Sequence, residues 1–335
     1  MGFHLADGTL YTYLQGDEYE DIAAAWDWDL IPGTTVDYRA TPLTCATAEQ
    51  TGLEPFVGGA SNNNTGVAAM RYQNPITKAF GWQKAWFFLD DDIQYVMITN
   101  ITSNTTAPVY SVLDQRRHSG TIYVDDDPFS APGNQTFNFT VSSLWHGNVG
   151  YRFDDTETAV FSLSVGPRTG AWSAIGTSTQ PPETVDLFAA WIEHQDLTRS
   201  ISYTIFPGTT LDNFREKRKG CLIIPLQNDA HISAILVADR LTISAVFWDV
   251  AGGTLALQAE TPSGESLASV TASGNVALMI DLWAGTLTVS DPSQKLDSVN
   301  ITIQRLDGAP LTITVELPTG PGGFAGSSII LNFAL

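Results

Sequence analysis

Short runs rich in β-branched and aromatic residues, separated by turn signals, recur along almost the whole chain. They include residues 84–89, 93–98, 119–124 and 200–206, and they become shorter after residue 221. Runs of this kind, bounded by Gly, Pro, Asn and Asp, predict β-strands, and their spacing is typical of a large sandwich. The low share of charged residues, 16%, agrees with this interpretation. We therefore predict an all-β chain.

The chain has 335 residues, which is too many for one ordinary hydrophobic core. Residues 209–220 interrupt the strand pattern, with Thr and Asp near their start, Lys and Arg near their end, and a Gly at the stop. These are the signals of a short helix. We predict a large β-sandwich domain over residues 1–208, a linker with a short helix over 209–220, and a smaller C-terminal β-sandwich domain over 221–335.

The N-terminal region combines alternating residues with an acidic, tryptophan-containing stretch. Residues 3–14 alternate around an Asp-Gly pair, which predicts a β-hairpin. Residues 17–35 begin with acids, contain Trp26 and Trp28, and pass through a Pro-Gly pair that predicts a type II turn. Two interpretations of the tryptophans remain open. They pack beneath an exposed acidic loop, or they form an aromatic platform on the wall of a sugar-binding cleft.

The net charge of −20 restricts the partners of the chain. It argues against nucleic acid, because phosphates need Lys and Arg to replace their counterions, and against an anionic membrane surface. The densest positive spot of the first domain is Arg116-Arg117-His118. Arginine forks bind carboxylates, so Arg116 and Arg117 are candidate contacts for an acidic ligand. The alternative is that they pair with neighbouring Asp residues.

Familiar catalytic and metal-binding motifs are missing from the sequence. It contains no Gly-x-Ser-x-Gly, no His-Glu-x-x-His and no Gly-rich phosphate loop after a strand. Cys45 and Cys221 lie far apart, so they do not have the spacing of a metal site, and they either pair or stay reduced. We expect no metal and no cofactor. We interpret His4, His146, His194 and His231 as structural, and the acidic run at 90–92 as a solvated hairpin tip.

Glycosylation sequons, and not a targeting segment, point to an extracellular protein. No apolar run is long enough to span a bilayer, and the first residues lack the basic start and apolar core of a signal peptide. Six Asn-x-Thr sequons nevertheless favour an extracellular glycoprotein, which suggests that the natural N-terminus precedes Met1. The glycosylation candidates are Asn63, Asn100, Asn104, Asn134, Asn138 and Asn300.

An ordered set of motifs carries a family resemblance. The first is Gly-Phe-His-Leu-Ala-Asp-Gly-Thr-Leu-Tyr-Thr-Tyr at residues 2–13, and the second is the tryptophan and Pro-Gly-Thr-Thr segment from Trp26 to Thr35. Further ones lie at 84–88, 113–116, 146–151, 203–208 and 289–294. Pro-Gly-Thr-Thr alone is a weak signal. The ordered set, which covers nearly the whole chain, resembles polysaccharide lyase family 8, the secreted lyases of hyaluronate, chondroitin and xanthan.

The resemblance implies three parts: an N-terminal α/α toroid, a central antiparallel β super-sandwich and a small C-terminal β-sandwich. This chain resembles the last two. It also implies β-elimination on uronic-acid polysaccharides, in which an Asn and a His engage the uronate carboxylate, a Tyr moves the proton and an Arg assists. Those groups lie on the toroid, and the family's Asn-Gly-Glu-Asn motif, expected just before Gly2, is absent. No catalytic residue is therefore assigned to this chain.

Two hypotheses from different classes follow. In the first, the chain is the β portion of a secreted polysaccharide lyase, lacks the toroid and is inactive alone. Its partners are then the toroid and an acidic polysaccharide, with Trp26, Trp28, Arg116 and Arg117 as candidate contacts. In the second, it is a non-catalytic carbohydrate-binding or scaffold protein whose tryptophans stack on sugar faces. A glycosidase with an unrecognised carboxylate pair is a more remote third.

Overall fold

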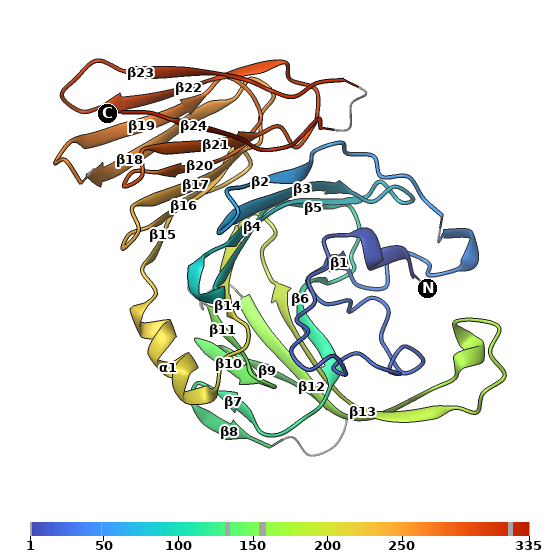
Figure 1. The fold of residues 1–335 in the computed structure, drawn as a ribbon. Coiled ribbons are helices and arrows are strands. Elements are labelled where there is room, and N and C mark those ends of the chain that lie inside the picture. The colour runs from blue at the N-terminus through green and yellow to red at the C-terminus, as the bar shows by residue number, and fades with distance from the viewer. Residues whose placement is uncertain are drawn as a thin grey trace. The chain divides into compact units, whose positions relative to one another are not determined.

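The structure, a computed structural model, describes residues 2–47, 49–130, 135–153, 159–260, 262–320 and 324–334. Nearly all regular elements in these ranges are β-strands, and the strand pairings are antiparallel (Figure 1). The strands form four sheets, of five, nine, six and four strands. This confirms the predicted all-β fold, with a large sandwich followed by a smaller one.

Contacts between residues divide the chain into two compact units. Unit 1 comprises residues 1–53, 72–82 and 101–218, and unit 2 comprises residues 54–71, 83–100 and 219–335. An α-helix, α1 (Leu211–Gly220), lies within the stretch for which the sequence predicts a short helix. The domain boundary and linker predicted there stay predictions.

The five-stranded sheet of unit 1 is built around a long hairpin of β12 (Ala159–Gly170) and β13 (Glu183–His194). Where β13 pairs with β6 (Val109–Arg117), a β-bulge sets Val112 opposite Trp191 and Asp114 opposite Ala190. Because neighbours along a strand point to opposite faces, the bulge puts Val112 and Asp114 on opposite faces of the sheet. The strand order is β1 (Thr35–Asp37), β6, β13, β12 and β9 (Thr136–Phe139).

The nine-stranded sheet includes strands whose residues belong partly to unit 1 and partly to unit 2. Its strand β4 (Phe80–Phe88) is buried along almost its whole length. A run of consecutive buried residues is expected of a strand that is covered on both faces. The strand order is β2 (Val57–Ser61), β3 (Gly66–Gln73), β4, β5 (Gln94–Ser103), β14 (Ile201–Phe206), β11 (Val149–Phe153), β10 (Ser143–His146), β7 (Ile122–Val124) and β8 (Asp127–Phe129).

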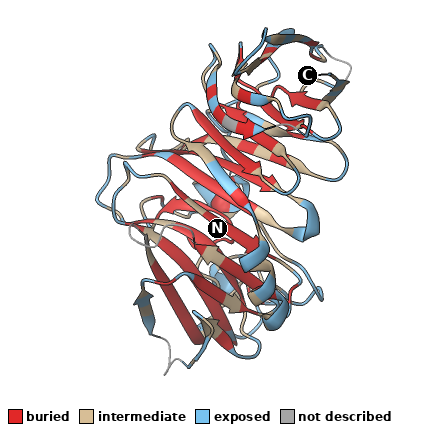
Figure 2. Cartoon of the chain, turned by 90° about the vertical axis from the view of Figure 1, so that its left-hand side faces the viewer, coloured by how far each residue is buried: buried red, intermediate tan, exposed pale blue. Residues whose placement is uncertain are grey.

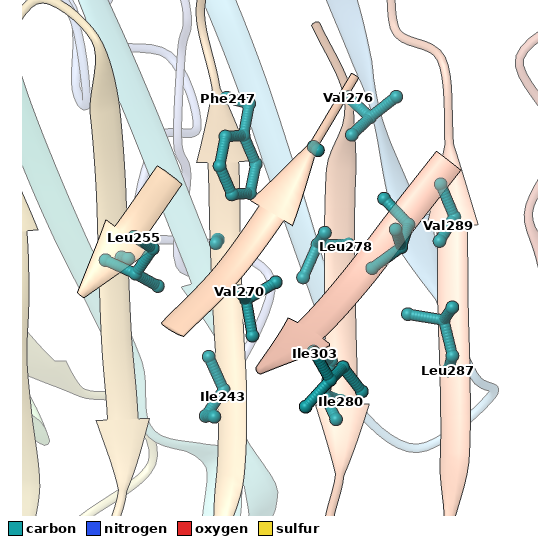
Figure 3. Packing of buried hydrophobic residues seen from close by; sticks show 14 of the residues in the cluster. Ile243, Phe247, Leu255, Val270, Val276, Leu278, Ile280, Leu287, Val289 and Ile303 are labelled. Carbon is teal, nitrogen blue, oxygen red and sulfur yellow. The ribbon is translucent and has the colours of Figure 1, made fainter. Parts of the chain in front are cut away.

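Two sheets of unit 2 form the C-terminal sandwich, with its core between them (Figure 3). The six-stranded sheet has the order β15 (Ile223–Asn228), β16 (Ile232–Val237), β17 (Thr242–Phe247), β20 (Ala277–Asp281), β21 (Thr286–Ser290) and β24 (Ile329–Asn332). The four-stranded sheet has the order β18 (Gly253–Glu260), β19 (Ser266–Ala272), β22 (Ser298–Arg305) and β23 (Leu311–Glu316).

The six-stranded sheet supplies side chains to two cores of unit 2. Along β17, Ile243 and Phe247 point into the sandwich core, whereas Val246 lies in a second core with Phe56 and residues of β4 and β5. Both faces of the central strands β17 and β20 are thus apolar and mostly buried, and in Figure 2 the buried residues, in red, lie mainly on strands. Each large apolar side chain buried in this way contributes about 1.5–3 kcal/mol relative to exposure.

The N-terminal segment does not form the predicted hairpin. A 3-10 helix, η1 (Gly2–Ala6), takes the place of its first strand, and none of residues 7–34 belongs to a strand. The buried ring of His4 explains the difference, because its ion pair with Asp7, at 2.9 Å, fixes a tight local fold. The predicted type II turn is confirmed: Thr34 N–H donates to Ile31 O at 3.2 Å, and Gly33 has a φ of 83°.

Candidate functional site

The acidic tryptophan stretch packs within unit 1 against the start of β13. Ile22 and Ala25 are buried against Val185 and Leu187 of that strand. Ile22, Ala25 and the ring of Trp26 thus hold the segment by burying apolar surface. The segment is therefore anchored as an irregular but packed layer and not as a free loop.

Five aromatic rings gather in this layer, and we call them the aromatic cluster: Tyr11, Tyr13, Tyr19, Trp26 and Trp28. Tyr11 stacks on Trp26 with 6.4 Å between ring centroids, and Trp28 meets Trp26 edge to face at 5.6 Å. Tyr13 meets Tyr19 at 5.0 Å and leaves 60% of its surface exposed. The cluster therefore combines packed rings with one ring that is open to solvent.

The two predicted tryptophans are both half-buried. Trp28 Nε1 donates a hydrogen bond to Ala23 O at 3.0 Å, so its polar edge is used within the segment. Trp26 lies against the apolar patch around Ile22. Each ring is thus partly packed and partly accessible, and sugar contact by Trp26 and Trp28 stays a prediction.

Arg116 is buried and held by unit 1 itself. Its guanidinium forms an ion pair with Asp114, donates to Tyr19 Oη at 3.0 Å and lies 5.3 Å from the centroid of the Tyr19 ring. Burial lowers the pKa of Arg116, but the carboxylate of Asp114 more than offsets this, so the pKa lies above its ordinary value. Of the two interpretations of Arg116, pairing with a neighbouring Asp is the one that agrees with this geometry.

Arg117 and His118 are partly exposed at the end of β6. Arg117 Nε donates to Glu20 O at 2.8 Å, which ties the acidic segment to the strand end. His118 Nδ1 lies 3.0 Å from Asp186 Oδ2, and its ring lies 5.5 Å from that of His146. Of the two predicted arginines, Arg117 is the one that solvent reaches, and its contact with an acidic ligand stays a prediction.

The histidines interpreted as structural lie in packed or paired positions. His146 stacks on Phe188 at 4.0 Å, and burial, with the positive charges of Arg116 and His118, lowers its pKa to about 3. His194 Nε2 lies 2.7 Å from Ser111 Oγ. His231 Nδ1 lies 2.5 Å from Asp249 Oδ2 at the surface.

A buried ionic network holds the start of the chain. His4 lies between Asp7, at 2.9 Å, and Asp29, at 3.5 Å. Burial lowers the pKa of His4, but hydrogen bonds and charge attraction from the two carboxylates raise it to about 9. Asp37 is buried nearby, and burial raises its pKa to about 6. The network anchors η1 and offers no accessible group to a ligand.

Sequence reasoning missed the tyrosines of the aromatic cluster and one exposed arginine. Arg39 is 71% exposed at its side chain, lies 4.8 Å from the centroid of the Tyr38 ring and approaches Asp27 at 3.9 Å. A Tyr-x-Tyr pair close to the tryptophan stretch was the available signal for Tyr11 and Tyr13. Nothing local predicts that Tyr38 and Arg39 lie beside Asp27, because that contact depends on the path of the segment.

The remaining predictions concern surface groups. The acids at 90–92 form an exposed 3-10 turn, η3 (Asp90–Asp92), between β4 and β5, as predicted. Cys45 is exposed and Cys221 half-buried, and neither forms a disulfide. Within the described ranges, no group of His, Cys, Asp and Glu side chains could hold a metal ion, and no helix is long and apolar enough to cross a membrane.

The glycosylation candidates divide into five described residues and one other. Asn63, Asn100, Asn104, Asn138 and Asn300 are all exposed. Asn134 lies outside the described residues. Exposure is a requirement for a glycan, and modification of these asparagines stays a prediction.

Comparison with known proteins identifies two matching family models. Residues 1–218 match the polysaccharide lyase family 8 super-sandwich domain, and residues 226–300 match the polysaccharide lyase family 8 C-terminal beta-sandwich domain. Chondroitinase-AC of Pedobacter heparinus is 28% identical over 340 residues, which covers 99% of this chain and 46% of that protein. Hyaluronate lyase of Staphylococcus aureus is 23% identical over 239 residues, or 69% of this chain and 29% of that protein.

Solved structures agree with these matches. A chondroitinase AC lyase superposes with a TM-score of 0.85 and 26% identity, covering 98% of this chain and 47% of that one. A Paenibacillus xanthan lyase shares the fold, with a TM-score of 0.83 and 20% identity, covering 98% of this chain and 33% of that one. The chain thus spans about half the length of the chondroitinases it matches, or less for the other relatives. With its super-sandwich and C-terminal sandwich both matched in order, the chain belongs to polysaccharide lyase family 8.

Proposed function

We propose that this chain is the β-domain part of an extracellular polysaccharide lyase that cleaves uronic-acid-containing polysaccharides by β-elimination. The observation that carries the proposal is the pair of family matches, super-sandwich first and C-terminal sandwich second. Similarity to a chondroitinase-AC and a hyaluronate lyase supports an acidic polysaccharide as the substrate.

The surface of unit 1 offers groups that suit an acidic sugar chain. The aromatic cluster provides ring faces, and Tyr13 is the most exposed residue of the cluster. Arg117 and Arg39 are partly or largely exposed cations in the same unit. We propose that this surface forms one wall of a substrate cleft and that Trp26, Trp28 and Arg117 contact the polysaccharide. Arg116 supports the wall from beneath through Tyr19.

The chemical step needs groups that this surface does not supply. Removal of a proton beside a carboxylate requires a neutralised carboxylate and a base that has lost its own proton. Burial raises the pKa of Tyr11 to about 12 and also raises the pKa of Tyr19, so neither hydroxyl is prepared to act as a base. We therefore propose that an α/α toroid, as the family resemblance implies, provides the catalytic Asn, His, Tyr and Arg, and that this chain alone is inactive.

The extracellular assignment rests on the sequons. Five candidate asparagines are exposed, on strands and turns of both units. We propose that the protein passes through a secretory pathway and carries N-linked glycans at some of them. Mass spectrometry of the protein secreted by a eukaryotic host tests this, and unmodified sequons throughout would contradict it.

Activity is tested with the 335-residue chain and with a fusion to the part of the Pedobacter heparinus chondroitinase-AC that lies outside its match to this chain, where the family resemblance implies the toroid. Each is incubated with chondroitin, hyaluronan and xanthan, and the ultraviolet absorbance of unsaturated uronides is followed. We expect no product from the chain alone and product from the fusion. Turnover by the chain alone would overturn the assignment of the chemistry to the toroid.

Binding is tested by tryptophan fluorescence titration with the same polysaccharides. We expect Trp26→Ala to weaken binding, whereas Phe324→Ala, which removes an exposed aromatic side chain of unit 2, serves as the control. Binding that Trp26→Ala leaves unchanged would remove the aromatic cluster from the cleft wall. The non-catalytic carbohydrate-binding alternative would be favoured by two results together: the chain alone binds polysaccharide, and the fusion is folded but inactive.

A further inference from the structure

Unit 2 contains a polar cavity of about 400 Å³ that the proposed function does not use. Four separate turns contribute to it: the loop between β2 and β3, η3 after β4, the β16–β17 turn and the β20–β21 turn. The lining residues are Asn62, Asn64, Thr65, Asp90, Asp239, Arg240, Thr242, Asp281 and Trp283. A volume of this size is within the range of small-molecule sites.

Trp283 is the only aromatic side chain in the lining, and it is 66% exposed. Its position is fixed by the turn that carries it. Asp281 Oδ1 accepts hydrogen bonds from Trp283 N–H at 2.9 Å and from Ala284 N–H at 2.8 Å. The next residue, Gly285, has a φ of 62° that few other residues adopt. The large ring is therefore presented to solvent by an ordered turn.

The loop between β2 and β3 contributes amide side chains to the lining. Asn62 Oδ1 accepts hydrogen bonds from the N–H groups of Asn64, at 3.2 Å, and Thr65, at 2.9 Å. Its carbonyl oxygen is thus used inside the loop, and its amide NH2 group holds the donors that this side chain can offer to a ligand. A second hollow, of about 360 Å³, shares Asn64 and Thr65 with the cavity and is lined mainly by small residues of β2 and β3.

Three carboxylates and one guanidinium complete the lining. Arg240 Nε lies 3.9 Å from both Asp90 Oδ2 and Asp239 Oδ2, which is too long for a hydrogen bond, and all three side chains are about half exposed. These groups can therefore bond to a ligand without breaking a tight internal pair. Carboxylate oxygens accept from hydroxyl groups, and the guanidinium donates to ring and hydroxyl oxygens.

An exposed indole face beside convergent acceptors and donors matches the chemistry of a pyranose ring, which has an apolar C–H face and a rim of hydroxyls. We propose that this cavity is a second carbohydrate-binding site, which takes a neutral hexose or N-acetylhexosamine unit with its face on Trp283 and its hydroxyls on Asp90, Asp239 and Asn62. The adjoining hollow gives room for the next unit of an oligosaccharide.

The charge of the lining decides against an acidic sugar. Asp90, Asp239 and Asp281 outnumber the single Arg240, so the lining carries a formal charge of −2. A uronate or sulfate would be repelled at this short range, whereas a neutral unit is not. The cavity therefore differs in ligand class from the surface of unit 1, where the candidate contacts are arginines.

The proposal is tested with the 335-residue chain produced in bacteria, so that no glycan occupies Asn63 beside the cavity. Saturation-transfer difference NMR and titration calorimetry are run with two neutral probes, cellotriose and chitotriose, and with a glucuronate-containing chondroitin disaccharide. We expect saturable binding of a neutral probe, and Trp283→Ala to weaken it about tenfold or more. Asp239→Asn is expected to weaken it by a smaller factor.

Phe324→Ala provides the matched control, because Phe324 is an aromatic side chain of unit 2 that is 71% exposed and does not line the cavity. It should bind the neutral probe like the unmodified chain. The proposal is overturned if neither neutral probe binds, if Trp283→Ala binds as the unmodified chain does, or if the chondroitin disaccharide competes for the same site more tightly than either neutral probe.

The test is independent of the proposed function. Loss of polysaccharide cleavage by the toroid fusion would leave binding at Trp283 unaffected, and loss of the neutral probe in Trp283→Ala should leave the response of Trp26 to chondroitin unchanged. Spermidine serves as a cationic probe. If the 335-residue chain binds spermidine at Trp283 and binds no neutral probe, the three carboxylates form a cation site, which contradicts the proposal.

Discussion

Asp114 and Arg116 form an ion pair on β6 in which 3% and 2% of the two side chains are exposed. Tyr19 Oη donates to Asp114 Oδ1 at 2.9 Å and accepts from the guanidinium at 3.0 Å, so the N-terminal segment is bonded to both partners. The pair therefore connects the strand to the aromatic cluster.

Asp114→Asn should destabilise unit 1 strongly. The substitution leaves the charge of Arg116 buried without its counterion, which costs about 3–5 kcal/mol. Urea unfolding followed by circular dichroism measures the change. The control is Asp212→Asn, which breaks an ion pair with Arg215 in which the Asp212 side chain is 91% exposed and should cost no more than about 1 kcal/mol. Equal losses in the two variants would contradict a special role of the buried pair.

Arg117→Ala separates polysaccharide contact from stability. Arg117 donates to a backbone oxygen of the segment and is partly exposed, so its loss should change the free energy of unfolding by about 1 kcal/mol or less. It should weaken binding of chondroitin, most clearly at low salt. Fluorescence titration at two salt concentrations measures this. Arg117→Lys should retain part of the binding, and unchanged binding in Arg117→Ala would remove this residue from the candidate contacts.

His4 should make the stability of unit 1 depend on pH in the alkaline direction. Its pKa is about 9 in the folded chain and 6.5 when unfolded, so the folded state holds the extra proton between these values. The stabilisation is fully present below pH 6.5 and is lost as the pH rises through 9, by on the order of 3 kcal/mol. Urea unfolding at several pH values should show this decline in the unmodified chain and a much flatter profile in His4→Gln.

Asp37→Asn should stabilise the protein at neutral pH. Among the described residues, neither carboxylate oxygen of Asp37 has a hydrogen-bond partner, and burial raises its pKa from 3.8 to about 6. A pKa raised on folding means that stability falls as the pH rises from about 4 to 6 and stays lowered above that. Removing the charge should raise the free energy of unfolding at pH 7 by about 1–2 kcal/mol. At pH 4 the gain should nearly vanish, and a gain of the same size at both pH values would contradict the assignment.

Gly150 on β11 accommodates the ring of Phe214 on α1. A Cβ at this glycine would lie 2.2 Å from Phe214 Cδ2, so Gly150→Ala should destabilise the protein by about 1–3 kcal/mol through overpacking. Phe214→Leu in the same chain should recover part of that loss, because the smaller side chain leaves room for the methyl group. Gly176→Ala is the control, since its Cβ would meet no atom closer than 4.0 Å. Thermal unfolding of Gly150→Ala, Phe214→Leu, the double variant and Gly176→Ala checks the coupling.

Much of the fold was predictable because strand signals are local. The runs at 84–89, 93–98 and 200–206 fall on β4, β5 and β14. The turn at Pro32-Gly33 and the short helix α1 follow from residue types that fix backbone angles or cap a helix. The hairpin at 3–14 was wrong because alternation alone does not reveal that His4 is paired with Asp7 and Asp29. Asp29 lies far along the segment, so this pairing overrode the local pattern.

The candidate site was less predictable than the fold. Trp26 and Trp28 were identified from their place in the acidic stretch, but their half-buried state depends on contacts with Ile22 and β13. Arg116 and Arg117 are neighbours in sequence and differ sharply in exposure, because successive residues of a strand face opposite ways. The bulge at Trp191 further decides which of the β6 side chains share a face.

The sequence by itself determined the all-β class, the turns, the absence of familiar catalytic motifs and the resemblance to polysaccharide lyase family 8, because these depend on residue type and order. Only the tertiary structure decided that Arg116 is paired and Arg117 is accessible, that burial and pairing raise the pKa of His4 and burial raises that of Asp37, and that Trp283 lines a polar cavity. Burial, pairing and convergence of separate turns bring together residues far apart in the chain, and no local pattern of residues specifies those distances.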